Sequence, residues 1–188
     1  MDTKSLMIET ATLLFQQKGY KNVGVNEILK ACNVTKGALY HHFPNGKEEL
    51  LIACLKGLNE AITIDIEDIF KKHPSTLEAI QSMIDKLIHN LETEGTITGY
   101  TFSSIVSEMA TVSEPVRQAC SLLYENMERI YCDKLVTEGY SQESASEMAL
   151  WMTASIEGAM MLCLTQKSTT PLKTIAKLLP TILKGRTS

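Results

Sequence analysis

Apolar residues recur at helical spacing along almost the whole 188-residue chain, and only short polar, glycine- or proline-containing segments interrupt them. Side chains three and four positions apart share one face of an α-helix, so each run predicts an amphipathic helix. Ten glycines and five prolines are few for a sandwich of many short strands with frequent turns. We therefore expect an all-α fold, with helices over residues 3–18, 25–32, 36–43, 45–72, 77–91, 100–109, 116–136, 145–164 and 172–183.

The N-terminal segment and the most apolar segment indicate a soluble protein. The first nine residues carry three charged side chains and lack the apolar segment of a cleaved signal peptide, so we expect a cytoplasmic location. Residues 148–164 are the most apolar, but they include Thr153 and Glu157 and are shorter than the roughly 20 residues that span a bilayer. This segment predicts a buried helix and no membrane contact.

The five cysteines are odd in number, widely spaced and free of any CxxC pair. This pattern argues against a disulfide framework and against a structural zinc site. We expect reduced cysteines in the core.

Positive charge is concentrated near the N-terminus, although the formal net charge of the chain is −4. Residues 18–47 contain five lysines and a single acidic residue, Glu27. His41 and His42 can add positive charge beside phosphate groups. A basic patch in this segment is compatible with nucleic-acid binding.

Residues 22–50 predict two short helices around a tight turn, followed by a longer helix. Thr35 can cap the second short helix and Pro44 ends it, while Asn45 can cap the longer helix with Glu48 reaching back to it. In the second short helix Leu39 and Phe43 face the core, and Lys36, Tyr40, Gly37 and His41 form neighbouring rows away from it. Gly37 and Ala38 have almost no side chain, so this helix can approach DNA closely. These are the parts of a helix-turn-helix DNA-binding motif.

This segment resembles the DNA-binding head of the tetracycline-repressor (TetR) family of bacterial transcription factors over roughly residues 4–60. The residues that agree in order and spacing are Gly19-Tyr20, Val25, Glu27-Ile28, Val34-Thr35-Lys36-Gly37, Leu39-Tyr40, His42-Phe43 and Lys47-Glu48-Glu49-Leu50. The resemblance implies that Thr35, Lys36, Tyr40 and His41 approach phosphates or base edges of operator DNA. It also implies that Lys47 meets a phosphate from the start of the longer helix.

The segment departs from the family pattern at two places. Val23-Gly24 stands where the family usually has two threonines, so one hydroxyl contact to phosphate is expected to be replaced by backbone N–H groups. The link Pro44-Asn45-Gly46-Lys47 is one residue longer than the commonest form. The sequence around it resembles a smaller branch that contains multidrug-responsive and flavonoid-responsive repressors.

Alternative interpretations of the same residues are weaker. A Tyr-His-His run can be a solvated helix face, and Lys47 can be a solvated lysine. Adjacent histidines diverge on a helix, which disfavours a metal site at His41-His42. Glu48 follows Gly46-Lys47 where a phosphate-binding loop requires Ser or Thr, so that motif is excluded. We find no catalytic constellation and expect no enzyme activity, no cofactor and no metal.

The remaining helices predict a body that binds a ligand and dimerises. We expect an apolar or aromatic small-molecule effector between the fifth and eighth helices, with Glu157 as the polar anchor and Phe102, Ile105, Met109, Met127 and Trp151 as wall residues. The alternative is that Glu157 pairs at a dimer interface and the aromatic residues are ordinary core. Met148, Met152 and Ile156 form part of one apolar stripe and Trp151, Ala154, Met161 and Leu162 another, so the eighth helix needs partners on both sides. We expect a homodimer through the last two helices, with Pro180 bending the ninth.

These observations predict residues 1–50 as the DNA-binding domain, with the fourth helix leading onward from about residue 46, and residues 51–188 as the ligand-binding and dimerisation domain. The predicted function is a transcriptional repressor released from double-stranded operator DNA by the effector. An activator, or a ligand-independent regulator of the same fold, remains the alternative.

Overall fold

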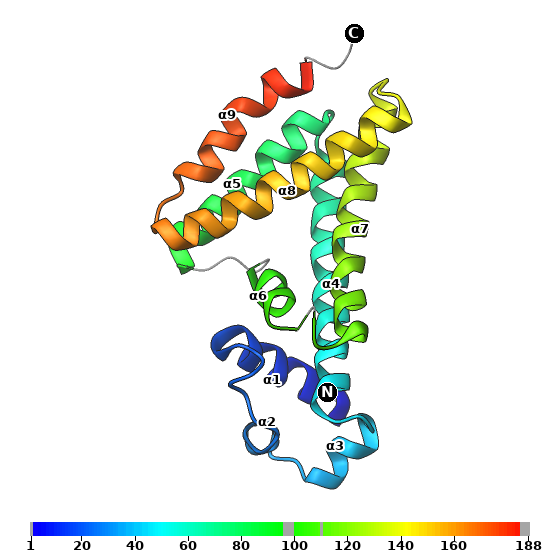
Figure 1. Cartoon of the computed structure of the whole chain (residues 1–188), viewed down its shortest axis with the longest axis vertical. Coiled ribbons are helices and arrows are strands. Elements are labelled where there is room, and N and C mark those ends of the chain that lie inside the picture. Colours follow the sequence, from blue (N-terminus) through cyan, green and yellow to red (C-terminus); the bar gives the residue numbers. More distant parts are fainter. Residues whose placement is uncertain (1, 96–99, 110, 185–188) are drawn as a thin grey trace. The chain divides into compact units, whose positions relative to one another are not determined.

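The computed structural model of the chain describes residues 2–95, 100–109 and 111–184, and the side chains of these residues except 100–104 and 184. Within these ranges the chain is α-helical and contains no strand (Figure 1). The predicted all-α fold is confirmed, and the helix bounds differ from the predicted ones by a few residues at most. The helices are α1 (Thr3–Lys18), α2 (Val25–Cys32), α3 (Lys36–His42), α4 (Lys47–Lys72), α5 (Thr76–Glu94), α6 (Tyr100–Met109), α7 (Glu114–Thr137), α8 (Gln142–Gln166) and α9 (Thr170–Lys184).

Short polar side chains begin several of these helices. Asp2, Ser75 and Ser141 each accept a hydrogen bond from the backbone N–H of the third residue of α1, α5 and α8 respectively. Such caps satisfy N–H groups that have no partner inside the helix, and each stabilises it by about 1 kcal/mol. Gly95 ends α5 with a φ of +68°, a conformation that glycine adopts without steric cost.

The chain divides into two compact units. The first comprises Met1–Ala61 and Thr101–Leu122, and the second comprises Ile62–Tyr100 and Leu123–Ser188. Helices α4 and α7 each contribute residues to both units.

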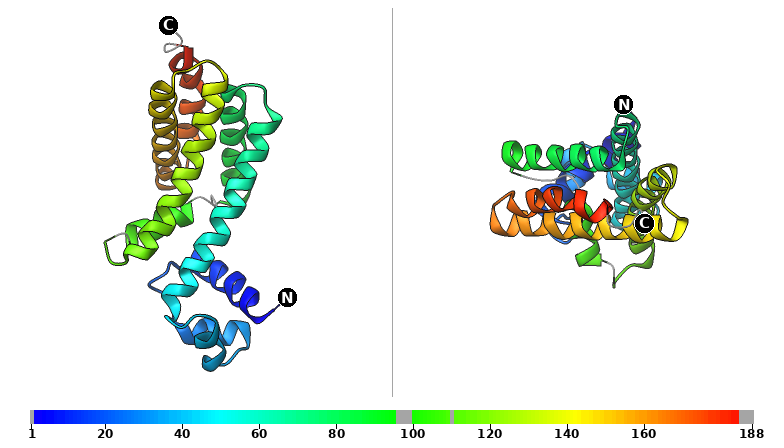
Figure 2. Two further views of the ribbon diagram at one scale, coloured as in Figure 1. Left: turned by 90° about the vertical axis from the view of Figure 1, so that its right-hand side faces the viewer. Right: turned by 90° about the horizontal axis from the view of Figure 1, so that it is seen from above.

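The core of the first unit forms where α1 packs on α2 and α3 next to the beginning of α4 (Figure 2). Burial of each large apolar side chain contributes roughly 1.5–3 kcal/mol. The buried side chains include Met7, Ala11, Phe15, Val23, Ile28, Leu39, Phe43, Leu50, Leu51 and Leu55.

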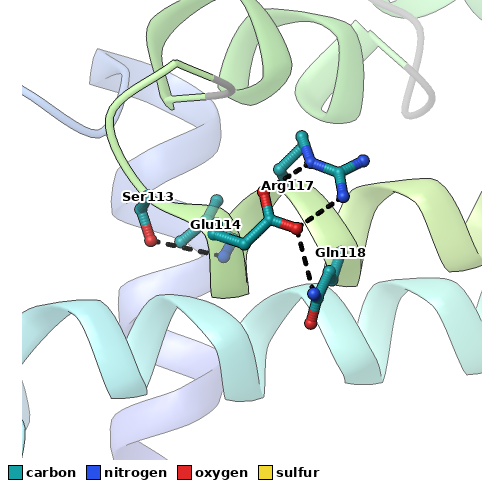
Figure 3. A network of polar contacts seen from close by, with 5 residues as sticks. Ser113, Glu114, Arg117 and Gln118 are labelled. Atoms are coloured by element: carbon teal, nitrogen blue, oxygen red, sulfur yellow. Dashed lines mark hydrogen bonds and ion pairs between the residues drawn. The ribbon is translucent and has the colours of Figure 1, made fainter.

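Polar contacts stabilise the first turn of α7, which also belongs to the first unit (Figure 3). The Ser113 hydroxyl accepts a hydrogen bond from the Val116 N–H at 3.3 Å. The Glu114 carboxylate accepts hydrogen bonds from Arg117 Nε at 2.7 Å and Gln118 Nε2 at 3.0 Å. These donors favour the charged carboxylate and lower the pKa of Glu114 to about 2.

In the second unit, α9 packs against α5 and α8 (Figure 1). Contacts between distant residues join the helix ends: the Glu138 carboxylate accepts hydrogen bonds from both the N–H and the hydroxyl of Thr76, and the Tyr140 hydroxyl donates to the Leu183 carbonyl. Pro180 lies inside α9.

All five cysteines are free and buried. Among the described helices, α8 is long and apolar enough to cross a membrane by length and composition only. The core helix of a soluble protein meets the same measure, and α8 has a row of buried residues from Ala145 to Cys163.

Candidate DNA-binding surface and ligand-binding unit

Local hydrogen bonds shape the turn between α2 and α3. Asn33 ends α2 in the left-handed conformation, with φ 53° and ψ 46°, and its N–H bonds to carbonyl oxygens of the last turn of the helix. Asparagine tolerates this conformation better than most residues. Thr35 then caps α3 by accepting a hydrogen bond from the Ala38 N–H at 3.2 Å. The predicted helix-turn-helix is therefore present.

The two faces of α3 differ as the sequence predicts. Leu39 is fully buried and Phe43 is 2% exposed, so this face is anchored in the core. Among the predicted DNA-binding residues, Thr35, Lys36, Gly37, Tyr40 and His41 are all exposed, and the structure places them together at and after the start of α3. The Lys36 ammonium lies 5.8 Å from the centre of the Tyr40 ring.

Gly37 lies in an open part of this surface. Among the described residues, a Cβ added there would come within 4 Å only of the Thr35 hydroxyl, at 3.8 Å, which is ordinary contact. The fold of the free protein therefore does not require a glycine at this position. Glycine also weakens a helix by about 1 kcal/mol relative to alanine.

Lys47 differs from the other predicted DNA-binding residues because it is half-buried. Its ammonium donates a hydrogen bond to the Tyr20 carbonyl at 2.6 Å and lies 3.9 Å from the centre of the Tyr20 ring. Burial lowers the pKa of Lys47, and the negative charge of Glu108 opposes that shift. Lys47 therefore fastens the start of α4 to the turn after α1, and the hydrogen bond to Tyr20 uses one of its three N–H donors.

The N-termini of α2 and α4 differ in their hydrogen bonds. Gly24 is the N-cap of α2 and gives it no side-chain cap hydrogen bond. The expectation that Asn45 caps α4 with Glu48 reaching back was wrong. Because α4 begins at Lys47, the third helical residue is Glu49, and its carboxylate accepts the Asn45 N–H at 2.9 Å.

Within the first unit, residues of α6 and of the α6–α7 turn contact the turn after α1 and the start of α4. The Glu108 carboxylate accepts the Lys21 N–H at 3.1 Å, and the Ser113 hydroxyl donates to the Glu48 carboxylate at 2.9 Å. The sequence offers no signal for these contacts, since 87 and 65 residues separate the partners.

The single acidic residue of the basic segment is also engaged. Lys18 forms an ion pair with Glu27, which joins the end of α1 to α2 and lowers the pKa of Glu27. Both side chains are partly exposed, so solvent screens this pair and we expect it to contribute little to stability.

The predicted ligand-binding residues fall in both units. Ile105 and Met109 are buried in the first unit, and the side chain of Phe102 lies outside the described residues. Met127 is buried in the second unit, where Trp151 and Glu157 are half-buried.

The second unit contains polar groups in its core that sequence reasoning missed. Tyr131 is fully buried, stacks on Phe70 with ring centres 5.1 Å apart, and donates its hydroxyl to the Met83 sulfur at 3.4 Å. Burial raises the pKa of Tyr131, and the negative charge of Glu157 adds to the shift. Thr153, one turn before Glu157 on α8, is 5% exposed and its hydroxyl is a buried group without a hydrogen-bond partner in the described structure.

A cavity of about 570 Å³ also lies in the second unit, which is within the size range of small-molecule sites. None of the predicted wall residues is among the described residues that line it. Its lining residues come from the ends of α5 and α8 and the segment after α8: Leu91, Glu92, Gly95, Cys163, Leu164, Lys167, Ser168 and Thr169.

The two apolar stripes predicted for α8 have different environments. Met148, Met152 and Ile156 are buried with the rest of the first stripe. Met161 and Leu162 of the second are 43% and 49% exposed. Leu150 of α8 and Leu178 of α9 are exposed as well, at 57% and 48%.

The described structure shows no group of three or more His, Cys, Asp or Glu residues placed to hold a metal ion. The helical fold and the exposed face of α3 define a helix-turn-helix transcriptional regulator. Two family models match the chain: "Bacterial regulatory proteins, tetR family" over residues 7–54, and "Transcriptional regulator LmrA/YxaF-like, C-terminal domain" over residues 76–178. The chain belongs to the TetR family of transcriptional regulators, which are not enzymes.

Individual relatives agree with this assignment over nearly the full chain. The HTH-type transcriptional regulator LmrA of Bacillus subtilis is 35% identical over 183 residues, covering 97% of each chain. The uncharacterized regulator YxaF of the same organism is 34% identical over 185 residues, covering 98% of this chain and 97% of its own. The crystal structure of reduced Escherichia coli NemR shares the fold, with a TM-score of 0.85 at 22% identity, and covers 97% of this chain and 98% of NemR.

Proposed function

We propose that the protein is a repressor that binds operator DNA through Thr35, Lys36, Gly37, Tyr40, His41 and Lys47. The observation that carries the proposal is the open face of α3, where a Cβ on Gly37 would strike no neighbour among the described residues. A close partner outside the chain explains a glycine at this exposed helical position. The lysines supply phosphate contacts, and Tyr40 supplies a contact to a base or phosphate.

We propose that residues 1–50 bind DNA and that residues 51–188 bind the effector and dimerise. The proposed location of the protein is the cytoplasm. The two recognition helices of a dimer must enter successive major grooves about 34 Å apart. We propose that the exposed apolar side chains of α8 and α9, including Met161, Leu162 and Leu178, pair with those of a second copy.

We propose further that an apolar or aromatic effector binds in the second unit at Met127, Trp151 and Glu157. The charge of Glu157 beside Tyr131 and the unpartnered Thr153 hydroxyl support a polar anchor in an otherwise apolar core. Contact of the effector with Phe102, Ile105 and Met109 stays a prediction. An effector that binds better to a non-operator conformation lowers DNA affinity by that preference, and α4, which belongs to both units, offers a continuous element for the coupling.

The experiment is fluorescence anisotropy of the full chain with labelled duplexes from the DNA flanking its own gene. Wild-type protein should prefer one duplex, and its affinity should fall steeply with salt. Lys36→Ala should weaken binding and lower the salt slope by about 1, whereas Lys72→Ala, at the end of α4, should change neither.

Added flavonoids and drug-like aromatics test effector release in the same assay. A compound that both binds the protein in a thermal-shift measurement and dissociates the complex supports the repressor. Equal affinity of Lys36→Ala and wild type at moderate salt would contradict the assigned DNA surface.

A further inference from the structure

The link between α3 and α4 forms a tight turn centred on Gly46. The Gly46 N–H bonds to the Phe43 carbonyl at 2.8 Å, and the Gly46 carbonyl accepts the Leu50 N–H at 3.1 Å. Gly46 has a φ of +70°, in the left-handed region that favours glycine. These bonds fix the backbone of Gly46 between α3, the recognition helix of the proposed DNA-binding motif, and α4.

Gly46 lies directly against the Tyr40 ring. A Cβ added to Gly46 would be 3.3 Å from Tyr40 Cε1, closer than side chains normally pack, and 3.7 Å from the Tyr40 hydroxyl oxygen, which is ordinary contact. Gly46 is buried, while Tyr40 remains 43% exposed. The ring therefore rests on the glycine with part of its surface open to solvent.

We propose that Gly46 is a positioning residue for DNA recognition, because it sets the orientation of the Tyr40 side chain on the recognition helix. This inference rests on the proposed function, in which Tyr40 contacts DNA. The one-residue-longer link places a residue without a side chain under the Tyr40 ring. A methyl group at this position would require the exposed ring to shift by a few tenths of an ångström from its place beside α3.

A second glycine in the same backbone conformation allows the contact with Tyr40 to be separated from backbone strain. Gly95 has nearly the same φ, +68°, but a Cβ added there would meet no atom of the described residues within 4 Å. Substitution of either glycine by alanine strains the backbone in the same way. Only substitution of Gly46 adds a contact with a proposed DNA-binding side chain, which makes Gly95→Ala the matched control.

The test is a double-mutant cycle with Gly46→Ala, Tyr40→Ala and the combined variant, measured by anisotropy on a specific and an unrelated duplex. Gly46→Ala should weaken specific binding by roughly 5- to 100-fold, the range expected for loss of one good base contact. It should leave non-specific affinity and the salt slope unchanged. In the Tyr40→Ala background the same substitution should have no further effect, and Gly95→Ala should bind as wild type. Circular dichroism confirms that each variant is folded at the assay temperature.

A second measurement follows the ring itself without DNA. The aromatic NMR resonances of Tyr40, identified by their loss in Tyr40→Phe, should move in Gly46→Ala and stay in place in Gly95→Ala. An equal loss of specific binding in the presence and absence of the Tyr40 side chain would overturn the proposal, as would unmoved ring resonances. Wild-type protein that prefers no duplex would instead refute the proposed function, and the ring resonances alone would then decide whether Gly46 positions Tyr40.

Discussion

Two buried threonines of the second unit should respond in opposite directions to the same substitution. The Thr153 hydroxyl is buried without a hydrogen-bond partner in the described structure, whereas the Thr76 hydroxyl donates to the Glu138 carboxylate at 2.7 Å. Valine keeps the branched shape of threonine but replaces the hydroxyl with a methyl group. The pair therefore isolates the cost of an unpaired hydroxyl from the value of a paired one.

The magnitudes follow from the two environments. An unpartnered hydroxyl costs about 1–3 kcal/mol to bury, so Thr153→Val should raise the free energy of unfolding by about 1–2 kcal/mol. A hydrogen bond to a charged group contributes about 1.5–3 kcal/mol, so Thr76→Val should lower it by a similar amount. In a chain of this size, each kcal/mol moves the unfolding midpoint by about 2–4 °C.

Differential scanning calorimetry at one fixed protein concentration measures both variants, since any dimer makes the midpoint concentration-dependent. We expect a higher midpoint for Thr153→Val and a lower one for Thr76→Val. A lower midpoint for Thr153→Val would mean that its hydroxyl has a partner in the native protein and would refute the reasoning. If the hydroxyl also anchors the effector, Thr153→Val should reduce the thermal shift that the effector produces.

Three further substitutions test other parts of the structure. Glu108→Ala removes the acceptor of the Lys21 N–H, so it should loosen the turn after α1 and weaken specific DNA binding by about 0.5–1.5 kcal/mol in anisotropy titrations, the value of a typical hydrogen bond; unchanged affinity would show that this bond does not support the DNA-binding surface. Leu162→Glu, which puts a charge into the proposed dimer stripe, should shift the protein toward monomer in light scattering, whereas the same mass as wild type would place the interface elsewhere. The pKa of Glu114 is lowered to about 2, mainly by the hydrogen bond from Arg117, so its stabilising charge is fully present above pH 4.5 and lost as the pH falls toward 2. Glu114→Gln should therefore melt below wild type at pH 7, and the difference should shrink as the pH falls from 4.5 toward 2; a difference that does not shrink over this range would contradict that cause.

The second unit shows where sequence reasoning about the site reached its limit. Met127, Trp151 and Glu157 were predicted as ligand contacts because they are apolar, aromatic or isolated charges on predicted helices. Their burial follows from the amphipathic pattern, which the sequence displays. The cavity beside Cys163 depends on how the ends of α5 and α8 meet, and no local pattern records that meeting.

The sequence by itself determined the helices and the recognition motif of this protein. Thr35 caps α3, and Leu39 and Phe43 share its buried face, because caps and i, i+4 rows depend on residues close in the chain. Only the tertiary structure decided which residues from distant parts of the chain contact each other. The bond from Lys47 to the Tyr20 carbonyl and the bond from the Lys21 N–H to Glu108 join residues that are 27 and 87 positions apart. Such contacts form when separate helices pack, and packing is set by the summed shapes and charges of all of them rather than by any short segment.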